Sequence, residues 1–171
     1  MDKTAPVEIE RKYVIRMPDI AKLRAENGYT VSDIEQTYLE SEPGVTRRVR
    51  KRVYKDRTVY TETKKVRIDV MSAHEDEREI SEGEYLELLK RRKDGTETLI
   101  KTRHTFVFLG QTFEVDIYPL WQKSAILETE LSSRDKVVVF PGFITVIVEV
   151  TGEKKYSNAS MSQKFPCELV Q

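Results

Sequence analysis

Charged and apolar positions alternate along much of the chain. In the segment 7–14, a strand would place Glu8, Glu10 and Lys12 on one face and the apolar Val7, Ile9 and Tyr13 on the other. The same alternation recurs later in the sequence. It is found at Arg48/Arg50/Arg52, Glu77/Glu79, Lys101/Arg103, Glu114/Asp116 and Glu128/Glu130. This repetition predicts a sheet in which several strands carry one ionic face and one apolar face.

Strands are expected where such alternation coincides with β-branched and aromatic residues between turn signals. The predicted strands are 7–14, 29–39, 45–54, 58–66, 75–80, 98–107, 112–118, 125–131 and 144–150. Pro43-Gly44 and Gly110 separate consecutive strands, which predicts antiparallel hairpins at both places.

Short helices are predicted at three places. The segment 18–28 begins with proline and ends with glycine, the asymmetry typical of helix ends. Ser81 and Glu84 have the spacing of a capping box, which predicts a helix that continues through Leu89. The segment 156–163 is interpreted as a loop leading into a short helix. Because strands and helices do not alternate, the pattern favours an antiparallel sheet or a closed barrel with helices added outside.

The charge balance limits the possible partners. The 171 residues, expected to form a single domain over 1–171, include 29 basic and 29 acidic side chains, so the formal net charge is zero. Without a bulk positive field, neither a nucleic acid nor a membrane surface is an expected partner, and an anion would have to be bound locally. The single Cys167, the lack of a signal-peptide pattern and the lack of a long apolar run predict a cytoplasmic protein.

The ionic faces allow two arrangements. Facing outward, they would be solvated, and the apolar faces would pack together as a sandwich. Facing inward, they would line a wet channel in which opposite charges lower the cost of burial. In that case clustered carboxylates would bind a hard cation such as Mg²⁺ or Mn²⁺, and clustered Arg and Lys would bind phosphate oxygens. Together the two sets suit a metal-bound polyphosphate.

The segment Val7-Glu8-Ile9-Glu10-Arg11-Lys12 resembles the Glu-x-Glu-x-Lys first strand of the CYTH group of triphosphate tunnel metalloenzymes. The resemblance extends over nearly the whole chain, in the order of the family. Its further motifs are 35–39, Arg48/Arg50, 60–64, Glu77/Glu79, 101–103, 113–116, 128–130, 148–151 and 155–158. The resemblance implies an α+β fold, an eight-stranded antiparallel β-barrel that forms a tunnel, with a few short helices packed outside.

The resemblance also implies roles for individual residues. The implied metal ligands are Glu8, Glu10, Glu128 and Glu130, with Asp116 as a further candidate. The implied phosphate-binding residues are Lys12, Arg48, Arg50, Lys64, Lys101, Arg103 and Lys155, and the implied catalytic residues are Glu8, Glu10 and Lys12. Glu77, Glu79 and Glu149 align less clearly. Arg47, Lys51 and Arg52 are interpreted as a solvated face, and His74 and His104 as ordinary strand residues.

The activity that the resemblance implies is the divalent-metal-dependent hydrolysis of a triphosphate, with inorganic tripolyphosphate as the leading substrate and Mg²⁺ or Mn²⁺ as cofactor. The expected partner is a small-molecule polyphosphate or nucleoside triphosphate. Lys12 could assist the attacking water only if neighbouring cations lowered its pKa. Adenylyl cyclase and thiamine triphosphatase activity remain alternatives on the same fold. The cyclases carry a His-Phe lead-in before the first strand, where this chain has residues 1–6. A module that binds polyphosphate or nucleotides without turnover is the alternative from another class.

Overall fold

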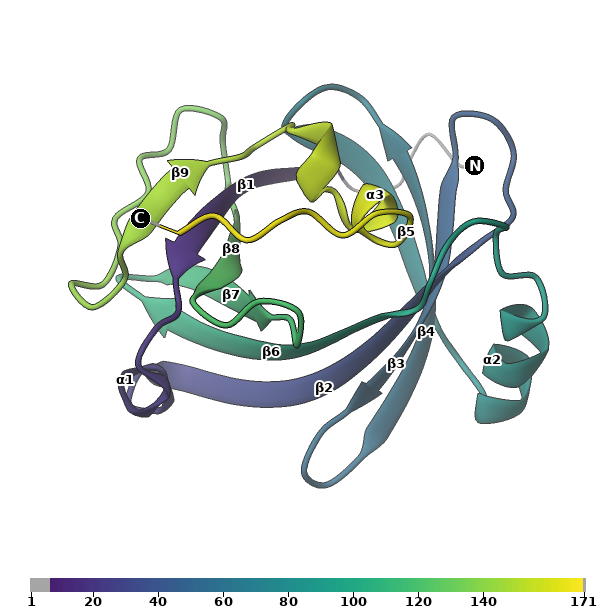
Figure 1. Cartoon of the computed structure of the whole chain (residues 1–171), viewed down its shortest axis with the longest axis horizontal. Coiled ribbons are helices and arrows are strands. Elements are labelled where there is room, and N and C mark those ends of the chain that lie inside the picture. Colours follow the sequence, from purple (N-terminus) through teal and green to yellow (C-terminus); the bar gives the residue numbers. More distant parts are fainter. Residues whose placement is uncertain (1–6, 171) are drawn as a thin grey trace.

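The computed structural model describes residues 7–170, which form one large antiparallel sheet and three short α-helices (Figure 1). The strands are β1 (Val7–Arg16), β2 (Asn27–Leu39), β3 (Thr46–Val53), β4 (Thr58–Arg67), β5 (Ser72–Ile80), β6 (Leu99–Phe108), β7 (Gln111–Ile117), β8 (Ser124–Glu130) and β9 (Val146–Glu149). The helices are α1 (Ile20–Arg24), α2 (Glu82–Leu89), α3 (Asn158–Met161) and the 3₁₀ turn η1 (Lys154–Tyr156).

Eight strands close into a ring. Their order is β5-β4-β3-β2-β6-β7-β8-β1, and the pairing of β1 with β5 joins the two ends. All of these pairs are antiparallel, so the expected eight-stranded antiparallel tunnel is confirmed as a closed ring. The ninth strand, β9, lies outside the ring and continues the β5 edge of β1, pairing with residues 13–15.

Local sequence signals account for several element boundaries. The Oγ of Ser81 accepts a hydrogen bond from the backbone N–H of Glu84 and so caps α2 where predicted, whereas the carboxylate of Glu84, the other half of the expected capping box, contacts Arg78 instead. Leu109 and Gly110 both have positive φ, as a two-residue hairpin between β6 and β7 requires. The helix predicted over 18–28 is shorter than expected. Asp19 caps it, it ends at Arg24, and β2 already begins at Asn27.

Most of the apolar core lies outside the ring. Phe106, Phe113 and Leu127 point outward from β6, β7 and β8, and pack against Phe140 and Phe143 of the segment that follows β8. The strand predicted over 144–150 is reduced to β9, because its first residues belong to this covering segment. As expected, α2 packs on the outer face, against Leu39, Val49 and Ile80.

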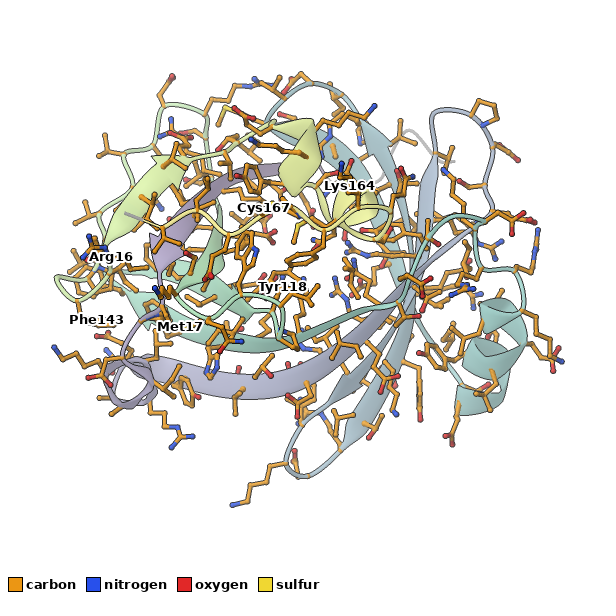
Figure 2. The ribbon with its side chains drawn as sticks, in the orientation of Figure 1. Arg16, Met17, Tyr118, Phe143, Lys164 and Cys167 are labelled. Atoms are coloured by element: carbon orange, nitrogen blue, oxygen red, sulfur yellow. The ribbon has the colours of Figure 1, made fainter. Side chains whose placement is uncertain are left out.

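A second apolar cluster fills one end of the ring. Val14, Ile126 and Tyr118 pack there with Trp121 and with Met161 of α3. Figure 1 shows α3 and the C-terminal tail lying across this opening, and Figure 2 shows Tyr118 beneath them. Unlike α1 and α2, α3 therefore closes an end of the ring and does not cover its outer face. Within residues 7–170, no helix combines the length and the apolar character that crossing a bilayer requires.

Candidate active site inside the ring

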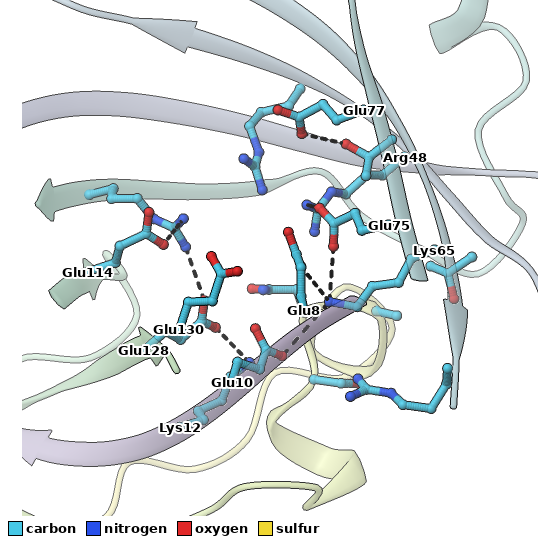
Figure 3. Close-up of a pocket in the computed structure, with 18 of the residues that line it drawn as sticks. Glu8, Glu10, Lys12, Arg48, Lys65, Glu75, Glu77, Glu114, Glu128 and Glu130 are labelled. Carbon is cyan, nitrogen blue, oxygen red and sulfur yellow. Dashed lines mark hydrogen bonds and ion pairs between the residues drawn. The ribbon is translucent and has the colours of Figure 1, made fainter. Parts of the chain in front are cut away.

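A cavity of 490 Å³ lies inside the ring and is lined almost entirely by polar side chains (Figure 3). Among the described residues, its acidic lining side chains are Glu8, Glu10, Glu75, Glu77, Glu114, Glu128 and Glu130. Its basic lining side chains are Lys12, Arg48, Arg50, Arg52, Lys65, Arg67 and Arg103. Seven charges of each sign therefore face one another, which offsets much of the cost of burying them.

The first strand brings its three charged residues into this cavity. Glu8, Glu10 and Lys12 line it together with Arg50 and Glu130, as the inward arrangement requires. The ladder between β1 and β8 pairs Glu10 with Glu130 and Lys12 with Glu128, so β8 adds its carboxylates to the same face. The inward arrangement of the ionic faces is thus confirmed, and the sandwich with outward charges is excluded.

Three carboxylates form an acidic group at the junction of β1 and β8. Glu10 and Glu130 are cross-strand partners, a like-charge pair that is unfavourable unless a cation lies close. The Nζ of Lys65 lies 3.9 Å from carboxylate oxygens of both Glu8 and Glu10. Burial and the neighbouring Glu75 and Glu130 raise the pKa of Glu8 to about 7. Burial and acidic neighbours therefore outweigh Lys65 and favour the protonated form of Glu8.

A basic group occupies β3 and β4. Arg48, Arg50 and Arg52 point inward from β3, and Lys65 and Arg67 line the same cavity from β4, where the ladder places Lys65 opposite Thr46. Burial and the neighbouring Arg48 and Arg103 lower the pKa of Arg50 to about 10. The Nε of Arg48 is buried and has no hydrogen-bond partner among the described residues. A buried excess of guanidinium groups is the chemistry of an anion site.

Comparison with solved structures gives a close match to this architecture. The inorganic triphosphatase NE1496 shares 25% sequence identity with the chain at a TM-score of 0.59, covering 94% of this chain and 97% of its own. The chain has the CYTH triphosphate tunnel fold. The PH1819 protein from Pyrococcus horikoshii OT3 shares the fold at 23% identity and a TM-score of 0.57, with 75% of this chain and 80% of its own covered. A conserved hypothetical protein from Pyrococcus furiosus matches at 23% identity and a TM-score of 0.56, with 74% and 80% covered. No protein-family model and no curated protein matches the chain.

A third group in the tunnel is neutralised by its own members. Asp116 is fully buried, and its carboxylate accepts hydrogen bonds from Lys101 Nζ at 2.6 Å and from Arg103 Nε at 2.6 Å. The guanidinium of Arg103 also contacts Glu114 and lies 3.3 Å from Glu128. Glu128 in turn pairs with Lys12 at 2.7 Å. Burial opposes the charge on Glu128, but Lys12 and Arg103 outweigh it and hold its pKa well below the ordinary value.

This pairing corrects two predicted roles. Asp116 and Lys101 are fully buried, pair with each other and do not line the cavity, so Asp116 does not fit a direct metal ligand and Lys101 does not fit a phosphate contact. Lys12 does line the cavity. Burial lowers its pKa, but Glu128 and Glu10 outweigh burial and raise it above the ordinary value. The condition for Lys12 to assist the attacking water, a lowered pKa, is therefore not met in this structure.

Two further predicted contacts lie outside the tunnel. Lys64 is exposed, whereas the adjacent Lys65 lines the cavity, because successive side chains of β4 point to opposite faces. Lys155 is also exposed, and its Nζ lies over the ring of Tyr156. In its place, α3 presents Asn158 to the cavity.

The three residues that align less clearly with the family also differ in whether they line the cavity. Glu77 lines the cavity, whereas Glu79 and Glu149 do not. Sequence analysis missed Lys65, Arg67 and Glu75, and assigned Arg52 to a solvated face although it lines the cavity. A signal was present for Arg52, since it has the same parity as Arg48 and Arg50 on one strand.

Proposed function

We propose that the chain is a divalent-metal-dependent triphosphatase that hydrolyses inorganic tripolyphosphate inside its tunnel. The observation that carries this proposal is the separation of unneutralised charge in one cavity. Three carboxylates, Glu8, Glu10 and Glu130, face five cations of β3 and β4 that have only Glu75 and Glu77 among them. A polyphosphate bound together with divalent cations would neutralise both groups at once.

The basic group would hold the substrate. Arg48, Arg50 and Arg52 present fixed donors to phosphate oxygens, and Lys65 adds a point charge next to the acidic group. The protonated Lys12 would act electrostatically, stabilising charge on the reacting phosphoryl group. The similarity to an inorganic triphosphatase at the level of the whole fold supports hydrolysis over binding without turnover.

The acidic group would hold the metal. As placed, no three acidic, His or Cys side chains within residues 7–170 converge on one point as ion ligands. The donor chemistry nevertheless fits, because the oxygens of Glu8, Glu10 and Glu130 are hard ligands, and a cation there would offset the burial and the acidic neighbours that raise the pKa of Glu8. Asp116 and Glu128, whose oxygens already pair with Lys and Arg, are left out of this set. A bound Mg²⁺ or Mn²⁺ would neutralise phosphate charge and supply an activated water.

The lining of the cavity favours an inorganic substrate over a nucleotide or thiamine triphosphate. Tyr38 is the single aromatic side chain among the described lining residues, and its hydroxyl is held by Gln36. A nucleobase or a thiazolium ring would therefore lack a stacking platform. The lead-in that argued against cyclase activity, residues 1–6, lies outside the described residues. A panel of tripolyphosphate, ATP, thiamine triphosphate and pyrophosphate, each with Mg²⁺ and with Mn²⁺, tests this choice by phosphate release.

Two adjacent lysines provide a matched test of the tunnel itself. Lys65→Ala is expected to lower kcat/KM for tripolyphosphate about a hundredfold, because it removes a cation that lies 3.0 Å from Glu75 and borders both charged groups. Lys64→Ala should leave kcat/KM within about twofold, since this side chain points to solvent from the same strand. Equal effects of the two substitutions in steady-state assays would contradict the assignment of the site to the tunnel.

Metal binding is expected to weaken in acid. Glu8 has a raised pKa of about 7, so below pH 7 a proton occupies the carboxylate that the cation needs. The apparent affinity for Mn²⁺ should then fall about tenfold per pH unit below pH 7 and level off above it. Titration calorimetry with Mn²⁺ between pH 5.5 and about 8 measures this slope. A flat profile would show that Glu8 is not a ligand.

A further inference from the structure

Gln36 is a buried, uncharged residue behind the basic group of the tunnel. It belongs to β2, has no exposed surface and does not line the cavity. Its cross-strand partner is Arg50, which does line the cavity. Any influence of Gln36 on a bound anion must therefore pass through the residues that it contacts.

The contacts of Gln36 orient a single guanidinium. Its Oε1 accepts hydrogen bonds from Arg50 Nε at 3.2 Å and from Arg50 Nη2 at 3.0 Å. Its Nε2 donates to the hydroxyl of Tyr38 at 2.9 Å. The opposite amide orientation would point N–H groups at N–H groups of Arg50, so these bonds fix the amide. One side chain thus sets the position of Arg50 and ties it to Tyr38.

Gln36 offers Arg50 a neutral hydrogen-bond acceptor, whereas a carboxylate that forms an ion pair would be expected beside a buried arginine. A buried arginine is ordinarily paired with a carboxylate. Among the described residues, Arg50 has no ion pair within 4 Å, whereas Arg48 is paired with Glu75 and Arg103 with Asp116. Burial and the surrounding arginines lower the pKa of Arg50 to about 10, so its positive charge is held at a cost to the folded chain.

We infer that Gln36 is a positioning residue that holds Arg50 through a neutral amide, so that the full charge of its guanidinium stays available for the anionic substrate. This inference presupposes the triphosphate site proposed above and names a residue that sets its affinity. A carboxylate in the same place would accept the same two hydrogen bonds from Arg50, with the Tyr38 hydroxyl as donor to its second oxygen, and would cancel the charge. Compared with a carboxylate, the uncharged amide lowers the stability of the fold and raises the affinity of the site for an anion.

The substitution Gln36→Glu tests the inference, because it changes charge at nearly constant shape. The new carboxylate, held beside Arg50, would be ionised at pH 7. The dissociation constant for tripolyphosphate, measured by calorimetry without divalent metal, is expected to rise about tenfold or more. The Tm in phosphate-free buffer is expected to equal or exceed that of the unmodified protein. KM should rise with little change in kcat.

Two other variants keep the test decisive. Gln36→Met removes the acceptor but leaves the charge of Arg50 unpaired, so it should lower Tm and weaken anion binding less than Gln36→Glu does. If Gln36→Glu fails to fold, weakened binding in a folded Gln36→Met protein supports the inference, and unchanged binding overturns it. Glu35→Gln is the matched control, because Glu35 is exposed on the same strand and pairs with Lys51 at 3.4 Å. It should leave both Kd and Tm unchanged.

The outcomes separate this inference from the proposed function. If Gln36→Glu binds tripolyphosphate as tightly as the unmodified protein, or if its Tm and its affinity fall together, the inference is overturned even where hydrolysis is observed. If the unmodified protein binds tripolyphosphate but does not hydrolyse it, the proposed activity fails. The comparison of binding and stability among the Gln36 variants stays valid in that case, because neither measurement depends on turnover.

Discussion

Replacing Glu8 or Glu10 by glutamine is expected to lower metal-dependent phosphate release from tripolyphosphate about a thousandfold. Both carboxylates line the cavity from β1, Glu8 where the strand pairs with β5 and Glu10 opposite Glu130 of β8. Glutamine keeps the shape of the side chain but removes the charge that a divalent ion needs. Steady-state assays with saturating Mg²⁺ or Mn²⁺ measure the loss, and a titration with Mn²⁺ shows whether metal binding is lost with it.

The fold should survive both substitutions. Removing one member of a like-charge pair relieves repulsion, so the Tm of Glu10→Gln in metal-free buffer is expected to match or exceed that of the unmodified protein. Glu149→Gln serves as the control, since Glu149 lies on β9 outside the cavity and should retain full activity. Activity that persists in both Glu8→Gln and Glu10→Gln would reject the assignment of the metal to this group.

Asp116→Asn is expected to lower the free energy of unfolding by about 3 kcal/mol. The substitution leaves the buried Lys101 and Arg103 without the carboxylate that pairs with both. Chemical denaturation at pH 7 measures the loss. Asp33→Asn is the matched control on strand β2, which is separated from β7 by β6. The carboxylate of Asp33 is exposed and accepts one hydrogen bond from Thr102, so this change should cost less than about 0.5 kcal/mol.

The lowered pKa of Asp116 is expected to make the stability of the fold depend on pH. Burial opposes the charge on Asp116, but Arg103 and Lys101 outweigh it and lower its pKa to about 2, below the value near 3.8 of an unperturbed aspartate. A carboxyl whose pKa is lower in the folded state stabilises the fold above its unfolded pKa. Its contribution is therefore complete above pH 4 and is lost as the pH falls toward 2. Unfolding curves in this range should be steeper in pH for the unmodified protein than for Asp116→Asn.

The strands and the first group of site residues could be predicted because their signals are local. Alternation placed Glu8, Glu10 and Lys12 on one face, and the same parity placed Glu128 and Glu130 opposite them once β1 and β8 had paired. The Ser81 cap of α2 depends on residues three apart in the sequence, and it too is present in the structure.

The remaining errors arose where the face or the partner of a residue depends on distant pairing. Lys64 and Lys65 are adjacent, and nothing local decides which of them points inward. The ladder between β4 and β5 decides it by placing Lys65 beside Glu75. Asp116 was a further candidate for a metal ligand because the resemblance to the CYTH group implied that role. Its actual partners come from β6, whose side chains reach both of its oxygens.

The apolar cluster at one end of the ring limits how a long polyphosphate could enter the tunnel and be hydrolysed. Val14, Ile126 and Tyr118 fill that end together with Met161, beneath α3 and the tail. The substrate would then enter and the product would leave through the opposite end of the ring, so the product would have to leave before the next substrate could bind. A long polyphosphate could insert only its tip, so shortening would proceed from the chain ends and not from the middle.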